Sequence, residues 1–142
     1  MYIEFICTKV SSPEPFDTAI SEFDAFENYE LLTAFYDACP ECESFPKEVY
    51  FQNGRNSDWT DYVILENGKI AARAGIWKFS DTEWEVAGVI THPDYRRRGY
   101  SERIVRHCTA KILAQNKTAF CTTAETNTAM IATLLKAGFQ IR

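Results

Sequence analysis

The sequence lacks a long hydrophobic run, an excess of positive charge and an even set of cysteines. Its 142 residues carry a formal net charge of −5, which argues against a general nucleic-acid-binding protein. A bilayer-spanning helix needs about 20 consecutive apolar residues, and the chain contains no such segment. The first residues, M-Y-I-E-F-I-C, have no basic region and include Glu4, so they do not predict a signal peptide. We therefore expect no nucleic-acid partner and no membrane association.

The five cysteines are an odd number and are spread along the chain as Cys7, Cys39, Cys42, Cys108 and Cys121. This distribution favours reduced thiols over a disulfide framework, and hence a cytoplasmic location. Cys39 and Cys42 form a C-x-x-C pair, which could be half of a zinc site or a redox pair. Because the sequence has no second C-x-x-C, we favour two ordinary thiols and expect no metal site.

The composition, with 46% hydrophobic and 25% charged residues, is typical of a globular protein, and the length predicts one domain over residues 1–142. The spacing of apolar residues indicates the secondary structure. We expect strands at residues 2–7, 61–66, 69–79, 83–91 and 118–124, and helices at 16–26, 29–38, 100–115 and 126–136. Residues 40–60 are expected to form a long loop, and Asn67-Gly68 predicts a type I′ hairpin turn.

The stretch of residues 86–99 reads V-A-G-V-I-T-H-P-D-Y-R-R-R-G. Its first five residues are apolar and rich in β-branched side chains, which predicts a buried strand that Pro93 ends. Apolar residues at helical spacing follow Gly99. The N–H groups at a helix start have no internal partner and attract anions, and three arginines precede this one. The unit predicts a phosphate or pyrophosphate site, although the arginines could also be a solvated surface cluster.

The pattern Arg96-x-x-Gly99-x-Ser101 resembles the acetyl-coenzyme A (acetyl-CoA) loop of the GNAT N-acetyltransferase superfamily. The family pattern is Q/R-x-x-G-x-G/A, and Ser101 departs from its last position but is also small. A second match, N-T-A-M-I-A-T-L-L-K-A-G-F at residues 127–139, is similar to the family's element of asparagine, helix and Gly-Phe. The two elements occur in the family's order and spacing, and the resemblance covers residues 60–139.

The resemblance implies an α/β fold of the α+β type, with a mixed, mostly antiparallel central sheet and helices on both faces. The family usually continues after Gly-Phe with two more strands, whereas this sequence extends three residues beyond Phe139. We therefore expect shortened C-terminal strands. The sheet edge would end in a stub, be completed by the N-terminal half, or be completed by a second subunit in a homodimer.

The resemblance also implies that acetyl-CoA is bound as a co-substrate. Its pantetheine arm would pair with the strand exit, and the matching positions are Val89, Ile90 and Thr91. Its pyrophosphate would lie against the N–H groups of the loop, where the matching positions are Arg96, Arg97, Arg98, Gly99, Tyr100 and Ser101. Asn127 matches the asparagine that hydrogen-bonds the pantetheine arm, although it could also be a simple helix N-cap.

Glu85 is the predicted catalytic base. It lies eleven residues before Arg96, a spacing similar to that of the strand glutamate that takes the amine proton in some family members. Apolar neighbours could raise its pKa by desolvation. Glu83, on the same strand face, is the alternative base, and Glu85 could also be an exposed residue without a role. The family's acid is a tyrosine, and Leu134 occupies that position, so the acid role is vacant or moved.

Neither histidine is predicted to be catalytic. We expect His92 to be structural or to border the substrate, and His107 to be solvated among basic helix residues. The predicted function is transfer of an acetyl group from acetyl-CoA to a primary amine of a small-molecule or peptide acceptor, by direct attack in a ternary complex. The missing tyrosine and the short C-terminus leave an alternative, a non-catalytic acyl-CoA-binding or regulatory module.

Overall fold

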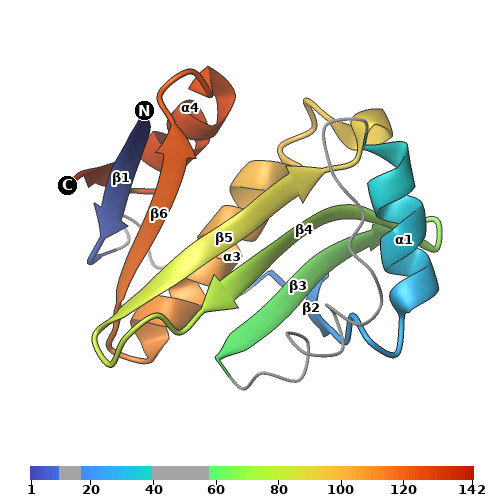
Figure 1. The fold of residues 1–142 in the computed structure, drawn as a ribbon, viewed down its shortest axis with the longest axis horizontal. Coiled ribbons are helices and arrows are strands. Elements are labelled where there is room, and N and C mark those ends of the chain that lie inside the picture. Colours follow the sequence, from blue (N-terminus) through green and yellow to red (C-terminus); the bar gives the residue numbers. More distant parts are fainter. Residues whose placement is uncertain (10–16, 40–57) are drawn as a thin grey trace.

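The computed structural model describes residues 1–9, 17–39 and 58–142. Within them, seven strands form one sheet in the order β2-β3-β4-β5-β6-β1-β7 (Figure 1). Neighbouring strands are antiparallel except for β5 and β6, which run parallel. This arrangement confirms the predicted fold class. The elements are β1 (Tyr2–Cys7), β2 (Ile20–Phe23), α1 (Tyr29–Ala38), β3 (Trp59–Glu66), β4 (Lys69–Trp77), β5 (Glu83–Thr91), η1 (Pro93–Tyr95), α3 (Tyr100–Ala114), β6 (Thr118–Ala124), α4 (Thr128–Lys136) and β7 (Gln140–Ile141).

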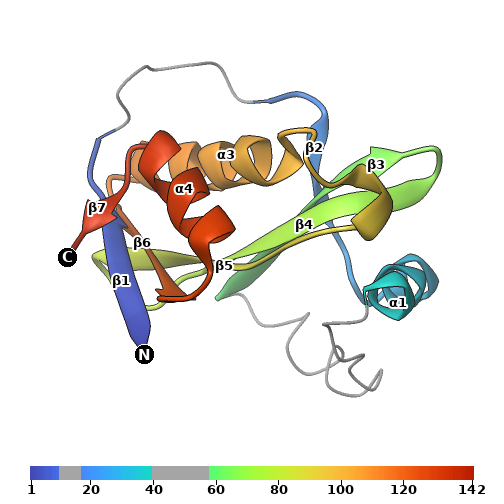
Figure 2. The same ribbon diagram turned by 90° about the horizontal axis from the view of Figure 1, so that it is seen from above.

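Helices cover both faces of the sheet (Figure 2). α3 and α4 lie on one face, where Ile104, Val105 and Ile112 of α3 are completely buried in the main core. These residues recur at helical spacing and so form one apolar stripe. α1 lies on the other face and contributes Leu32 and Phe35 to a second apolar cluster with β3 and β4. β4, which lies between β3 and β5, is buried over its seven inner residues and therefore supports β5 beside it.

β5 and β6 pair only at their beginnings and then diverge (Figure 1). Their register covers three residue pairs and ends at Glu85↔Phe120. A bulge against β4 follows, at Gly88, which has a φ of +62°. Only Val86 is fully buried in this part of β5, whereas residues 87–91 are partly or fully exposed. The expectation of a buried strand here is wrong beyond Val86, because β6 turns away and no other described strand takes its place.

The helix expected over residues 16–26 is wrong. Phe16 lies outside the described residues, and β2 pairs antiparallel with β3. Ile20 enters the main core, whereas Phe23 contacts the second cluster on the other face of the sheet. Residues three apart share a face on a helix but point to opposite sides of a strand, so this spacing also suits a strand with apolar contacts on both faces. Asp24 then accepts two backbone N–H groups of the following turn, which ends the strand.

The remaining expectations agree closely with the structure. β1, α1, β5 and β6 have the predicted bounds, and Asn67 and Gly68 both have the positive φ that a type I′ turn requires. The predicted 40–60 loop lies outside the described residues up to position 57, and its last two residues belong to β3. β7 is a two-residue strand that pairs with β1. No helix in the described ranges has the length and apolarity needed to cross a membrane.

Candidate functional site

Two adjoining cavities open where β5 separates from β6. The loop cavity, of about 650 Å³, is lined by the end of β5, residues 95–97 and 99–102, and one face of α4. The strand cavity, of about 380 Å³, is lined by residues 85–89 of β5, residues 121–123 of β6, and Tyr2, Asn127 and Met130. Val89 and Asn127 line both cavities. The site is therefore an extended groove with two chemically different ends.

The loop cavity lies at the start of α3. The first hydrogen bond of the helix runs from the N–H of Arg103 to the carbonyl of Gly99, so the N–H groups of residues 100–102 have no partner within the helix. Arg97 and Gly99 have φ values of +63° and +79°, which shape the tight turn into the helix. The free N–H donors and the positive end of the helix dipole together favour a bound anion.

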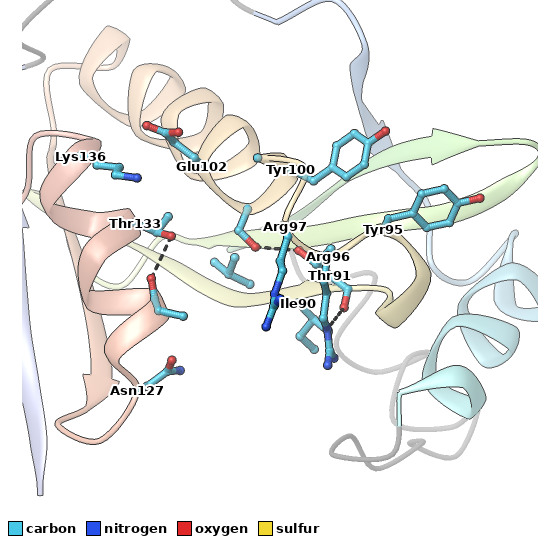
Figure 3. Close-up of a pocket in the computed structure, with 14 residues that line it drawn as sticks. Ile90, Thr91, Tyr95, Arg96, Arg97, Tyr100, Glu102, Asn127, Thr133 and Lys136 are labelled. Atoms are coloured by element: carbon cyan, nitrogen blue, oxygen red, sulfur yellow. Dashed lines mark hydrogen bonds between the residues drawn. The ribbon is translucent and has the colours of Figure 1, made fainter.

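The three arginines of the loop take different positions. Arg97 extends into the space between the loop and α4 (Figure 3). Arg96 also lines the loop cavity, and its Nε donates a hydrogen bond of 3.1 Å to the carbonyl oxygen of Thr91. Arg98 is not among the lining residues, because its guanidinium lies over the ring of Tyr95, 5.5 Å from the ring centroid. The structure thus brings two of the three predicted side chains to this cavity.

Two further hydrogen bonds hold the loop in place. The hydroxyl oxygens of Ser101 and Thr91 are 2.6 Å apart and join the start of α3 to the end of β5 (Figure 3). The hydroxyl of Tyr100 donates to Glu66 at 2.7 Å, and this bond raises the pKa of Tyr100. Ser101, which replaces an expected glycine or alanine, therefore adds a hydrogen bond while remaining small enough to line the cavity.

α4 forms the opposite wall. The side-chain oxygen of Asn127 accepts the N–H of Met130 at 3.2 Å, so this residue is a helix N-cap as well as a lining residue of both cavities. Ala129, Thr133 and Lys136 line the loop cavity from the same helix, facing the arginines (Figure 3). The sequence analysis missed these three residues. Their spacing of three or four positions, which places the three residues on one helix face, was the signal that could have identified them.

The bulge leaves one side of β5 free of strand partners. Ile90 and Thr91 pair with β4, but no described strand pairs with residues 86–91 on the other side. A Cβ atom at Gly88 would lie 3.0 Å from Nη1 of the buried Arg73, so a larger residue would disturb this part of the strand. Val89, Ile90 and Thr91 all line the loop cavity, and the open strand edge could pair with an extended ligand.

Glu85 lies at the last residue pair before β5 and β6 diverge, and it lines the strand cavity. Burial, together with the nearby charge of Glu4, raises the pKa of the Glu85 carboxyl. The alternative base, Glu83, lines neither cavity. It binds the Arg142 guanidinium, with one contact of 2.8 Å, and this hydrogen bond lowers the pKa of Glu83. The environment therefore favours Glu85 over Glu83 as a proton acceptor near neutral pH.

Three other expectations can be compared with the structure. Leu134 is completely buried in the main core, so this position provides no proton donor. His107 is only 5% exposed and packs against Tyr62 at 5.4 Å between ring centroids, which contradicts the expected solvated position; burial lowers its pKa. His92 is structural, because its Nδ1 accepts the N–H of Asp94 at 3.1 Å and caps η1.

The cysteines give little support to a metal site. Cys39 is buried at the end of α1, and Cys42 lies outside the described residues. Cys7, Cys39, Cys108 and Cys121 form no disulfide. Across residues 1–9, 17–39 and 58–142, no three His, Cys, Asp or Glu side chains are grouped to hold a metal ion.

Comparison with solved structures shows the same fold in several acetyltransferases. A protein from Novosphingobium aromaticivorans described as a GNAT-family acetyltransferase superposes with a TM-score of 0.75 at 24% identity, covering 99% of this chain and 59% of that one. A GNAT-family acetyltransferase from Colwellia psychrerythraea gives 0.74 at 20% identity, covering 99% and 52%. The chain thus spans little more than half the length of these two proteins. The ribosomal-protein-S18-alanine N-acetyltransferase of Escherichia coli gives 0.66 at 22% identity, covering 85% and 76%.

The family follows from the sequence match. No curated protein matches the chain. The model of the acetyltransferase (GNAT) family matches residues 25–139. These residues include β5, the loop before α3, α3 itself and α4, all of which contribute to the walls of the cavities. The chain therefore belongs to the GNAT acetyltransferase family.

Proposed function

We propose that the protein is an acetyl-CoA-dependent N-acetyltransferase that acts on a primary amine of a small molecule or peptide. The observation that carries this proposal is the pair of adjoining cavities. One end of the groove offers helix N–H donors with Arg96 and Arg97 for an anion, and the other end holds the half-buried carboxylate Glu85. A CoA thioester has the matching layout, with phosphates at one end and the reactive acyl group at the other. The four cysteines within the described residues form no disulfide, which fits a cytoplasmic location.

The groove offers a contact for each part of the co-substrate. The N–H groups around Gly99, Tyr100 and Ser101 would bind the pyrophosphate, supported by Arg96, Arg97 and the backbone of Arg98. Residues 89–91 would pair with the amides of the pantetheine arm along the open edge of β5. The side-chain oxygen of Asn127 is occupied as a helix cap, which leaves its NH₂ group to donate to the arm.

The reaction would proceed by direct attack of the amine on the thioester in a ternary complex. Glu85 would take the amine proton, either directly or through one water, so that the nitrogen lone pair is free to attack. The C–N bond then forms as the C–S bond breaks. Burial in the strand cavity suits Glu85 to this role because it raises the pKa of the carboxyl above its ordinary range.

One observation favours a second candidate, a non-catalytic acyl-CoA-binding module. Leu134, at the position of the family's acid, is completely buried and has no proton to give. Both candidates bind acetyl-CoA, but only an enzyme releases free CoA thiol in the presence of an amine. The difference between them is therefore measurable.

The test combines binding and turnover. The purified protein is melted with and without acetyl-CoA, and is then incubated with acetyl-CoA and a panel of small primary amines and peptides while free thiol is detected. We expect acetyl-CoA to raise the melting temperature by mass action, and thiol release above the amine-free rate, with an acetylated product of the expected mass. A melting shift without thiol release for any amine would favour the binding module, and no melting shift would contradict both.

A further inference from the structure

The proposed reaction needs a proton for the departing thiolate, and α4 does not supply it. Leu134 is buried, and Met130, which lines the strand cavity from the same helix, has no acidic proton. Among the described residues that line this cavity, Tyr2 is the one phenol. Tyr2 is 73% exposed, and its hydroxyl forms no hydrogen bond within the described residues.

The β1–β6 ladder fixes the position of Tyr2. Tyr2 pairs with Ala124, and beside this pair the N–H of Glu125 donates to the carbonyl of Met1 at 3.0 Å. Phe5, three positions later on β1, enters the main core on the face covered by α3. Because side chains alternate along a strand, Tyr2 points to the opposite face. Tyr2 and Glu85 both line the strand cavity, Tyr2 from β1 and Glu85 from β5.

Tyr100, Tyr36 and Cys121 are less suited than Tyr2 to donate this proton. The hydroxyl of Tyr100 is bonded to Glu66, and the hydroxyl of Tyr36 accepts a hydrogen bond of 3.0 Å from Arg73. Cys121 lines the strand cavity but is only 4% exposed and belongs to the main core. Burial raises the pKa of this thiol to about 12, so it is a weak acid in a position with little access.

We propose that Tyr2 is the general acid of this acetyltransferase, replacing a tyrosine that the family places on α4. The inference rests on the proposed function. As the amine nitrogen bonds to the acetyl carbon and the C–S bond breaks, the Tyr2 hydroxyl gives its proton to the thiolate sulfur. The amine proton goes to Glu85. Because Tyr2 is largely exposed, its phenolate regains a proton from water, and Glu85 releases its proton to solvent before the next turnover.

The charged groups around Tyr2 determine how the pH dependence of kcat can be assigned to Tyr2 or to Glu85. Glu4 lies on the same strand face, Glu85 lines the same cavity, and the N-terminal ammonium is 3.7 Å from the carboxylate of Glu125. Arg142 binds Glu4 at 3.1 Å. Carboxylic acids as a class lose their proton in acid, whereas phenols lose theirs only in alkaline solution. A role of Tyr2 as an acid therefore belongs to the alkaline limb of the profile and that of Glu85 to the acidic limb.

The experiment compares Tyr2→Phe with the parent and with Tyr29→Phe, which removes a hydroxyl from α1 at a position that lines neither cavity. The amine that gives the fastest thiol release in the panel serves as acceptor. We expect kcat of Tyr2→Phe to fall at least about tenfold. The expected decrease in kcat can be smaller than the about 10²–10⁴-fold contribution typical of a positioned acid, because a thiolate is already a good leaving group. The KM for the amine and the melting shift with acetyl-CoA should be unchanged.

The pH profile separates an acid from a residue that only contacts the acceptor. The parent and Tyr29→Phe should lose kcat in alkaline solution, and Tyr2→Phe should lack that decrease while keeping the acidic limb. An unchanged kcat, a change confined to the KM for the amine, or an alkaline limb retained in Tyr2→Phe would overturn the assignment of Tyr2 alone. If the parent shows no amine-dependent thiol release, the proposed function fails, and the role of Tyr2 fails with it.

Discussion

At the scale of single residues, two carboxylates on one strand face have opposite environments. Glu85 is half-buried in the strand cavity with a raised pKa, whereas Glu83 is bound to Arg142 and has a lowered pKa. The pair differs in accessibility to the groove but not in side-chain chemistry. The pair therefore provides a test of the proposed catalytic base, Glu85, with Glu83 as a matched control.

We predict that Glu85→Gln lowers kcat at least about 10²-fold near neutral pH, the lower bound of the contribution of a positioned base. Turnover should recover partly in alkaline solution, where the free amine deprotonates by itself. The control Glu83→Gln removes a carboxylate from the same face and should keep near-parental kcat. Steady-state thiol release against pH measures both. Near-normal turnover of Glu85→Gln at neutral pH would remove Glu85 from the mechanism.

The same substitution should stabilise the fold. Burial raises the pKa of Glu85 in the folded protein, so the folded state binds this proton more tightly than the unfolded state does. The charged form therefore costs stability at neutral pH, and that cost disappears as pH falls through the raised pKa. Glu85→Gln should melt at a higher temperature than the parent at pH 7, and the gap should close in acid. A lower melting temperature at pH 7 would contradict the burial of this charge.

Glu102 allows a test of the anion site by charge. It lines the loop cavity at the start of α3, 3.1 Å from Arg106, and its negative charge opposes an anionic ligand. We predict that Glu102→Gln tightens acetyl-CoA binding by about twofold to fivefold, the size of an exposed charge interaction, and that high salt reduces the gain. Lys136→Gln, on the facing wall, should weaken binding. Titration calorimetry measures both, and shifts of the same sign would argue against an electrostatic origin.

At the scale of elements, the turn that leads into α3 determines whether a ligand can reach the N–H donors at the start of this helix. Gly99 has a φ of +79°, and a Cβ atom there would meet nothing within 4 Å. A substitution is thus costly through backbone strain and through the space that it takes from a ligand, not through clashes in the core. Gly68, in the β3–β4 turn, has a φ of +75° and the same open surroundings, but it lines neither cavity.

We predict that Gly99→Val and Gly68→Val lower the melting temperature of the free protein by similar amounts. A left-handed conformation costs an L-residue roughly 1–2 kcal/mol. Acetyl-CoA should still raise the melting temperature of Gly68→Val, but should give little or no increase for Gly99→Val. Thermal melting with and without acetyl-CoA makes the comparison. An undiminished shift for Gly99→Val would place the co-substrate elsewhere.

At the scale of the whole molecule, Arg142 connects strands from distant parts of the chain. Its backbone N–H donates to the carbonyl of Glu4 at 3.0 Å, and its guanidinium binds Glu4 and Glu83. The contacts join β7, β1 and β5 on the sheet face opposite α3. Because these side chains are partly exposed, solvent screens each ion pair. The pH dependence of the change in melting temperature is therefore a better test of these ion pairs than the size of the change.

We predict that Arg142→Gln lowers the melting temperature at neutral pH and that the difference from the parent vanishes in acid. Arg142 lowers the pKa of Glu83 in the folded state. The stabilisation is therefore present above the pKa of an unfolded glutamate and is lost as pH falls through the lowered folded value. Melting curves over an acidic pH series measure the gap. A difference that persists at the lowest pH would assign the effect to packing or to the backbone bond.

The sequence alone determined the elements whose signals are local. The alternation of side chains predicted β1, helical spacing predicted α1, and the Asn67-Gly68 turn predicted the β3–β4 hairpin. These signals are local because side-chain period and turn conformation depend on neighbouring residues. The basic loop before α3 and the helix cap Asn127 were found for the same reason. The match of two short motifs indicated the family, and the family model that matches residues 25–139 confirmed it.

Only the tertiary structure decided the features that depend on contacts between distant segments. Ile20 and Phe23 have a spacing that fits a helix, but pairing with β3 makes them a strand, and packing against Tyr62 buries His107 in spite of its basic neighbours. The divergence of β6 from β5 creates the strand cavity and brings Tyr2 and Glu85 to one opening. No local pattern could link these two residues, because their proximity results from strand order, which long-range packing determines.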